Sequence, residues 1–415
     1  MILEKYSFGV GDRFGRQGKA LLRAIIKAKN QGFNITPVWN KSHREHITVN
    51  TVPASVRAEA DEAVKTLGFD GSYYVDADHI GMGNVSLFID SSDFYTLDVG
   101  GFIGQVANEN EVSAFKNKCE KYVGSLSVPG IDKNFEIRQE QLEDIARKFL
   151  PAVKEAGRIY RHIEMVKGAD NFITEVSMDE TNKPQTPVEM FLILAAISDE
   201  GIPAQTIAPK FTGRFNKGVD YVGNVDKFAK EIEQRLAIIA FAVREFSLPE
   251  NLKLSVHSGS DKFSIYKAIN KASKKLDAGL HIKTSGTTWL QELAGLAIAD
   301  GDGLSIAKKI YTDALLRFDE LCVPYASVID INRSKLPSMD VVDRWSGAEF
   351  ASALCHDQSC DKYNPDFRQL LHIAYKIAAE MGADFLNAVV KNEEIIAQNV
   401  TENIYQRHIK PIFME

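Results

Sequence analysis

The stretch Leu252–Lys262, LKLSVHSGSDK, contains the unit on which the fold is built. Its first residues, up to His257, alternate between apolar and polar, as a short β-strand does, and small or charged residues follow. A helical pattern over Lys262–Lys275 comes directly afterwards. The order of strand, polar turn and helix is typical of a β/α unit, in which the residues at the carboxyl end of the strand are available for chemistry.

Similar units recur along the chain. The predicted strands are Asn34–Trp39, Ser72–Asp78, Phe94–Val99, Phe172–Ser177, Gln205–Ala208, Leu252–His257, Gly279–Lys283 and Pro324–Ile329. The predicted helices are Gln17–Lys29, Ser55–Leu67, Glu140–Met165, Pro187–Ser198, Asp226–Glu245, Lys262–Lys275 and Leu304–Phe318. Strands that recur after helices pair in parallel, and about eight of them favour a closed barrel over an open sheet. The sequence therefore predicts an α/β fold, a (β/α)8 barrel of the TIM type.

The chain beyond the predicted barrel is helical. Its helical patterns are Phe367–Glu380, Ala383–Lys391 and Val400–His408. No internal repeat and no Pro/Ser-rich linker separates them from the rest of the chain. We therefore expect a catalytic barrel domain over residues 1–331 and a C-terminal helical extension over residues 332–415 that packs on the barrel.

Composition and charge limit the class of function. The net charge of −7 and the pI near 5.8 argue against a nucleic acid or an anionic membrane as the partner. The first residues do not resemble a signal peptide, and the apolar stretch Leu236–Val243 is too short to span a bilayer. Four scattered cysteines predict free thiols in a reducing compartment. We expect a cytoplasmic protein that acts on a small molecule, and a homo-oligomer is compatible with this sequence.

Three predicted strands end in or near a histidine. His79 follows the strand YYVDAD, His257 ends the strand LKLSVH, and His281 lies in GLHIK. A barrel brings such strand ends together, and neutral imidazoles bind a divalent cation such as Zn²⁺, Ni²⁺, Mn²⁺ or Fe²⁺. A single histidine of this kind is more often a hydrogen-bonding residue in a loop, but three at similar strand ends favour a metal site.

Carboxylates accompany these histidines. Asp78 precedes His79, and strand alternation places Glu175, Ser177 and Asp179 on one face of their strand. Paired carboxyl groups next to a metal are suited to moving protons. Glu175 and Asp179 both remain candidates for the second acid, and Asp179 is also a candidate substrate ligand.

The segment Gly9–Gly15, GVGDRFG, resembles a dinucleotide fingerprint, but it lacks the GxGxxG spacing and a clear preceding strand. We reject a nucleotide site and expect Asp12 and Arg13 to belong to a polar substrate pocket.

Two basic segments predict an anion site. Lys210 and Arg214 follow the strand QTIA, and Ser258, Ser260, Asp261 and Lys262 lead into a helix. The N–H groups at the start of a helix, together with nearby cations, bind anions. We expect these residues to bind the carboxylate of a substrate.

Six phrases, in order between residue 7 and about residue 290, resemble the tagaturonate epimerases (tagaturonate/fructuronate epimerase). They are SFGVGDRFGRQGKA, YVDADHI, EVSMDETNKPQTP, IAPKFTGRFNKGVDYVG, LSVHSGSDKFSIY and HIKTSGTTWL. The resemblance implies reversible epimerisation of D-tagaturonate and D-fructuronate in galacturonate catabolism, with a divalent metal. It implies Asp78 as a proton acceptor and His79 as a metal ligand, with His257 and His281 as the natural further ligands and Glu175 favoured over Asp179 as the second acid.

The chemistry of such a substrate is consistent with a metal and carboxylates. The inverted carbon is β to the ketone, so its C–H proton is not acidified by that carbonyl. A retro-aldol route, which removes the hydroxyl proton and breaks the neighbouring C–C bond, is therefore favoured over direct deprotonation. A metal-dependent sugar isomerase or aldolase would use the same residues. A non-catalytic sugar-acid binding protein is the alternative from another class.

Overall fold

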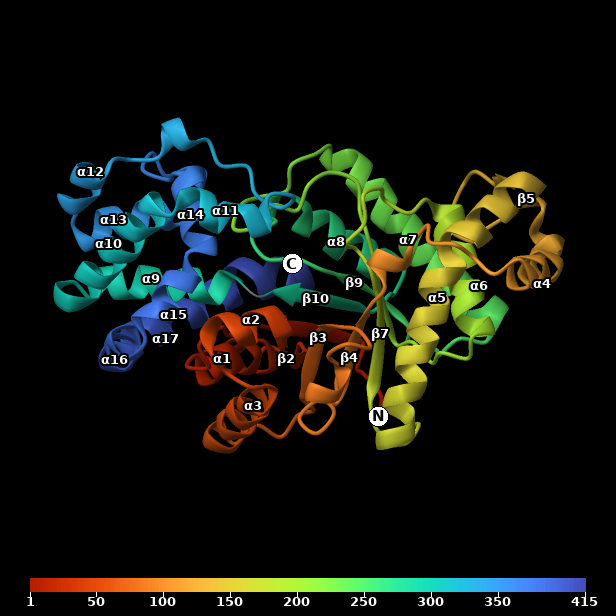
Figure 1. The fold of residues 1–415 in the computed structure, drawn as a ribbon, viewed down its shortest axis with the longest axis horizontal. Coiled ribbons are helices and arrows are strands. Elements are labelled where there is room, and N and C mark those ends of the chain that lie inside the picture. The colour runs from red at the N-terminus through yellow and green to blue at the C-terminus, as the bar shows by residue number, and fades with distance from the viewer. Residues whose placement is uncertain (285) are drawn as a thin grey trace.

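The computed structural model describes residues 1–284 and 286–415. Eight parallel strands close into a barrel in the order β1-β10-β9-β8-β7-β4-β3-β2. They are β1 (Tyr6–Val10), β2 (Thr36–Ser42), β3 (Tyr74–Ile80), β4 (Phe94–Asp98), β7 (Ile173–Met178), β8 (Thr206–Pro209), β9 (Lys253–Val256) and β10 (Leu280–Thr284). The predicted (β/α)8 barrel is confirmed, and Figure 1 shows the strands at its centre.

Seven barrel strands overlap predicted strands, and the eighth does not. The predicted strand Pro324–Ile329 is wrong, because this segment forms the 3₁₀ turn η4 (Val323–Tyr325) and a loop. β1 takes its place and closes the barrel by pairing with both β2 and β10. Gly9 in β1 allows this closure, because a Cβ at that position would lie 3.0 Å from the Cα of Lys283 on β10.

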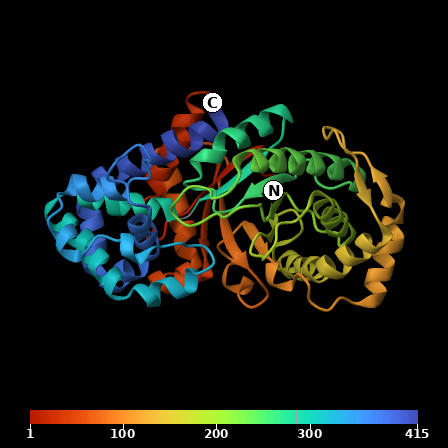
Figure 2. The ribbon, with the colours of Figure 1, turned by 90° about the horizontal axis from the view of Figure 1, so that it is seen from above.

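Helices surround the barrel. Those up to β10 are α1 (Gly18–Lys29), α2 (His43–Val49), α3 (Pro53–Leu67), α4 (Glu109–Cys119), α5 (Gln139–Lys167), α6 (Pro187–Asp199), α7 (Val225–Phe246) and α8 (Phe263–Lys275). A short antiparallel pair, β5 (Gly124–Leu126) and β6 (Phe135–Ile137), lies beside α4 at one side of the molecule (Figure 2). The apolar stretch Leu236–Val243 lies within α7, where Leu236, Ile238 and Ile239 are buried.

A group of C-terminal helices covers the opposite side of the barrel from β5 and β6 (Figure 2). They are α9 (Gly286–Ile298), α10 (Gly301–Leu316), α11 (Phe318–Cys322), α12 (Met339–Asp343), α13 (Gly347–Leu354), α14 (Pro365–Ile373), α15 (Tyr375–Met381), α16 (Ala383–Lys391), α17 (Glu393–Glu402) and the π-helix η6 (Asn403–Met414). The domain boundary between residues 331 and 332 remains a prediction. Helices α9 and α10, which precede it, pack against α13 and α14, which follow it.

The end of the chain returns to the barrel. Helix η6 packs against α1 and α8, and the ring of Phe413 lies 5.5 Å from that of Tyr6 on β1. Among the described helices, none combines the length and apolar character needed to cross a membrane. The four cysteines are unpaired.

Candidate active site

A polar cavity of about 450 Å³ opens at the carboxyl ends of the barrel strands. Residues at the ends of β2, β3, β4, β7, β9 and β10 line it, and residues of α2, η4 and α15 complete its wall. The lining residues include Arg13, Arg44, Asp78, His79, Asp98, Asp179, Lys217, His257, Ser258, Lys283, Tyr325 and Tyr375. Its position is the one at which barrel enzymes carry their active sites.

His79, Asp179 and His257 form a group suited to a metal ion. One ligand atom from each lies within 4.8 Å of the others. His79 reaches this point through a local irregularity, because it has a φ of 54° and the pairing of β3 with β4 shifts register between Ala77 and Ile80. The Nδ1 atoms of both histidines are buried and make no hydrogen bond of suitable geometry, although each has a carboxylate oxygen within 4.0 Å. Two imidazoles and one carboxylate are a common ligand set for divalent transition metals.

His257 is held between two carboxylates. Its Nε2 lies 2.7 Å from Oε1 of Glu175, and its Nδ1 lies 3.2 Å from Oδ1 of Asp179. The hydroxyl of Ser177 donates to Asp179 over 2.6 Å. Metal-bound histidines usually donate their second N–H to a carboxylate, which fixes the tautomer and the ring. Glu175, which is fully buried, has this relation to His257.

The carboxylates of the cavity favour positive charge on both histidines. Burial by itself lowers the pKa of His79, but Asp78, Asp98 and Asp179 overcome this effect and raise it to about 10. Burial likewise opposes the charge on His257, and Asp179 and Glu175 raise its pKa to about 9. The donor atoms and the surrounding charge both fit a cation.

Lys283 lies at the centre of a second cluster, beside the first. Its Nζ lies 2.7 Å from Asp76, 2.8 Å from Asp78 and 3.1 Å from Glu175. Burial raises the pKa of Asp78, but Lys283 and His79 lower it to about 2, so this carboxyl group is ionised. Burial raises the pKa of Asp76 to about 7, and Lys283 offsets only part of that effect.

The predicted third histidine ligand, His281, stays a prediction, and the structure places it outside the metal group. It is fully buried, its Nδ1 pairs with the hydroxyl of Ser7 at 2.8 Å, and burial lowers its pKa to about 3. Strand register explains the difference. His281 pairs with Ser255, two residues below His257, which is about 6.6 Å deeper in the barrel. Asp179 lies where the third ligand was expected.

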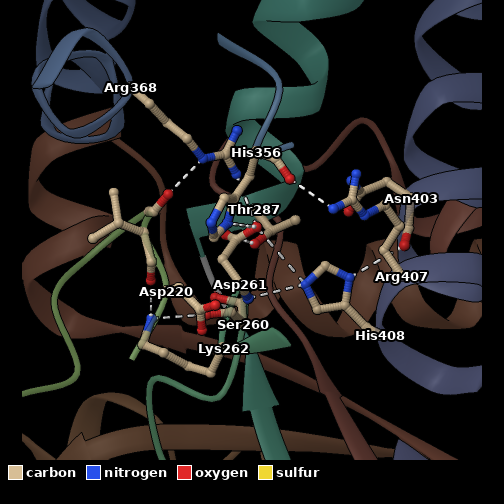
Figure 3. A network of polar contacts seen from close by, with 12 residues as sticks. Asp220, Ser260, Asp261, Lys262, Thr287, His356, Arg368, Asn403, Arg407 and His408 are labelled. Atoms are coloured by element: carbon tan, nitrogen blue, oxygen red, sulfur yellow. Dashed lines mark hydrogen bonds and ion pairs between the residues drawn. The ribbon is translucent and has the colours of Figure 1, made fainter. Parts of the chain in front are cut away.

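The predicted contact of Lys262 with substrate also stays a prediction, and the structure gives its ammonium group other partners. Its ammonium group is buried and donates to the carbonyl oxygens of Asn216, Val219 and Ser260 at 2.8–3.0 Å. Asp261 is equally unavailable, because it accepts hydrogen bonds from Arg368 at 2.9 Å and from Thr287 at 2.7 Å (Figure 3). Ser260 is buried and lines neither this cavity nor its neighbour.

The other predicted substrate residues divide between two places. Arg13 and Ser258 line the cavity, whereas the carboxylate of Asp12 accepts hydrogen bonds from the N–H groups of residues 14–17. Lys210 and Arg214 line an adjoining cavity of about 640 Å³, and Arg214 pairs there with Asp330 at 2.8 Å.

Sequence reasoning did not assign roles to Lys283, Asp76, Arg44 or Lys217. Lys283 follows His281 by two residues and therefore points to the same side of β10. This alternation, combined with the register of β10 and β9, places Lys283 at the same height in the barrel as His257. Arg44 and Lys217 lie in segments whose approach to the cavity depends on tertiary folding.

Comparisons with known proteins identify the family of this chain. A family profile described as tagaturonate epimerase matches residues 1–412. The chain is 27% identical to the tagaturonate/fructuronate epimerase of Thermotoga maritima, over 97% of this chain and 80% of that protein. Two crystal structures of the fructuronate-tagaturonate epimerase from Cohnella laeviribosi, one with glycerol and one native, share the fold with TM-scores of 0.82 and 0.79. Each is 23% identical and covers 99% of this chain and 82% of that one. The profile spans nearly the whole sequence, and the chain therefore belongs to the tagaturonate epimerase family and, with it, to the isomerases.

Proposed function

We propose that this protein is a metal-dependent epimerase that interconverts D-tagaturonate and D-fructuronate. The family match over residues 1–412 carries the proposal. The grouping of His79, Asp179 and His257 beside Asp78 and Lys283, at the mouth of the barrel, supports it. The unpaired cysteines are consistent with the cytoplasmic location that we also propose.

His79, Asp179 and His257 would hold the metal. Nitrogen and oxygen ligands of this kind accept Zn²⁺, Ni²⁺, Mn²⁺ and Fe²⁺. The bound ion would supply Lewis-acid polarisation of substrate oxygens. Glu175 positions His257 through its 2.7 Å contact, and it lies below the cavity lining, where it does not meet the substrate directly.

Asp78 is the proton acceptor in this proposal. It takes the proton from the hydroxyl group on the carbon β to the ketone. The O–H electron pair forms the aldehyde, the C–C bond between the α and β carbons breaks, and its electron pair forms the enolate. After the aldehyde turns its other face, the enolate adds to it, and Asp78 returns the proton to the new alkoxide. Atoms and charge balance, and only the configuration of the β carbon changes.

Lys283 keeps Asp78 ready for this role. Its ammonium group lies 2.8 Å from the Asp78 carboxylate and favours the ionised form that accepts a proton.

The test is NMR spectroscopy of tagaturonate incubated in D2O with purified protein. We expect fructuronate to form without deuterium at the inverted carbon, since that C–H bond stays intact. Deuterium at that carbon would contradict the retro-aldol route. Movement of the carbonyl group would indicate an isomerase, and release of two shorter fragments would indicate an aldolase. Binding without any reaction would favour a sugar-acid binding protein.

A further inference from the structure

Three positive side chains gather around two tyrosines at the wall of the cavity. The guanidinium carbon of Arg44 lies 5.3 Å from the centre of the Tyr325 ring, and Nζ of Lys217 lies 5.8 Å from it. The guanidinium carbon of Arg13 lies 3.9 Å from the centre of the Tyr375 ring. The two tyrosine hydroxyl groups are 3.0 Å apart, so the three cations share one part of the wall.

Two of these three charges, those of Arg44 and Lys217, have no ion-pair partner among the described residues, whereas Arg13 has one. Arg13 pairs with Glu45 at 3.1 Å and donates to the carbonyl oxygen of His372. Across the described part of the chain, no carboxylate oxygen comes within 4.0 Å of the charged nitrogens of Arg44 or Lys217. Burial, followed by the repulsion of Arg13 and Arg44, lowers the pKa of Lys217 to about 8. Lys217 is partly buried and Arg44 is exposed at the cavity mouth, and a bound anion would pair with both charges.

The backbone that carries Lys217 is firmly held. Lys262 donates to the carbonyl oxygens of Asn216 and Val219, and Arg368 donates to that of Gly218. The N–H group of Lys217 donates to the carbonyl oxygen of Val328 over 2.8 Å. Figure 3 shows Lys262 and Arg368 converging from the loop after β9 and from α14. Both residues therefore position the loop, and Lys217 is presented to the cavity in a fixed place.

We propose that Lys217 and Arg44, with Arg13 adding positive charge, bind the carboxylate group of the sugar-acid substrate. This proposal rests on the proposed function, because it names the end of that substrate which the reaction leaves unchanged. At the strand ends, the same cavity is lined by Asp78, Asp98 and Asp179, which repel an anion. The charge of the cavity therefore orients a sugar acid with its carboxylate toward Tyr325 and its hydroxyl groups toward Asp78.

The experiment compares the binding of two unreactive six-carbon probes by calorimetry. Galactonate carries a carboxylate, and galactitol is a neutral polyol of the same length. We expect Lys217→Met and Arg44→Met each to weaken galactonate binding by about ten- to a hundredfold, the usual effect of losing one charge-assisted hydrogen bond. Galactitol binding should stay unchanged, and Lys217→Arg should restore most of the lost affinity.

Lys271, an exposed residue of α8 that lines neither cavity, provides the matched control as Lys271→Met, which removes the same charge. Equal losses for both probes would overturn the proposal, as would unchanged galactonate binding or the absence of galactonate binding to the unmodified protein. A loss of galactonate binding in Lys210→Met or Arg214→Met, but not in Lys217→Met, would also overturn the proposal. It would indicate that the carboxylate binds in the adjoining cavity. Because these probes do not react, a selective loss without any epimerisation of tagaturonate would refute only the proposed function.

Discussion

The substitution Glu175→Gln tests whether Glu175 and Asp179, the two carboxylates that contact His257, have different roles. Gln has the same shape and can still accept a hydrogen bond from Nε2 of His257, which lies 2.7 Å from Glu175. Lys283 keeps Asp76 at 2.7 Å and Asp78 at 2.8 Å, so its charge stays paired. We therefore expect Glu175→Gln to fold.

The expected effect of Glu175→Gln is a loss of metal affinity, and its size can be stated. Losing a carboxylate that orients a metal-bound histidine typically weakens metal binding by about 10- to 100-fold, which corresponds to about 1.4–2.7 kcal/mol. Asp179→Asn removes a ligand itself, so it should weaken binding by more than Glu175→Gln does. Competition with a chelator of known affinity measures both, and turnover is followed with and without excess metal. Turnover of Glu175→Gln should recover in excess metal, whereas turnover of Asp179→Asn should not.

Glu292→Gln is the control, because this residue is also fully buried but lies outside the cavity lining, and burial raises its pKa. The reasoning is refuted if Glu175→Gln keeps its metal affinity but loses turnover by a factor of about 10²–10⁴. That result would make Glu175 the second acid, as the sequence suggested. An unchanged metal affinity in Asp179→Asn would remove Asp179 from the ligand set.

Three further predictions concern single residues. His281→Gln should keep its metal affinity, because His281 lies below the metal group, whereas His79→Ala should lose it; equal losses measured by the chelator assay would restore His281 as a ligand. Arg368→Met should lower the free energy of unfolding by about 3–5 kcal/mol at pH 7, since it leaves Asp261 buried without its partner. Burial opposes the charge on Asp261, but Arg368 holds the pKa of Asp261 well below the usual range. The stabilisation by this pair is therefore present above about pH 4 and fades as the pH falls further. Urea unfolding that shows the same difference between Arg368→Met and the unmodified protein at all pH values would contradict this. Galactonate affinity should fall as the pH rises above about 8, because Lys217, which is surrounded by Arg13, Arg44, Glu45 and Glu180, then loses its proton. Lys217→Arg should abolish this fall, and calorimetry over that pH range tests it.

The barrel could be predicted because most of its strands alternate or are β-branched and recur between long amphipathic helices. β1 escaped prediction because it has only five residues, YSFGV, and one of them is a glycine that packs against Lys283. The segment Pro324–Ile329 has the composition of a strand, but Tyr325 contributes to the cavity wall through tertiary contacts.

The site was predictable at the level of strand ends but not at the level of register. His79, His257 and Asp78 line one cavity, as the pattern implied. Whether a polar residue lies at the mouth of the barrel or one layer below depends on the pairing of neighbouring strands. This pairing places His281 one layer below the mouth and Lys283 at the mouth. The network around Asp261 links residues 216–219 to α14 and η6, a long-range arrangement that no local pattern encodes.

The central claim is that catalysis depends on a metal held by His79, Asp179 and His257. The most direct measurement strips the protein of metal and titrates it with Mn²⁺, Ni²⁺, Zn²⁺ or Fe²⁺ while NMR follows the conversion of tagaturonate to fructuronate. We predict that activity is absent at first and rises in proportion to bound metal until one equivalent per chain is reached, with at least one of these ions. Full epimerase activity in the metal-free protein, or activity that needs metal but persists in His257→Ala, would contradict the account.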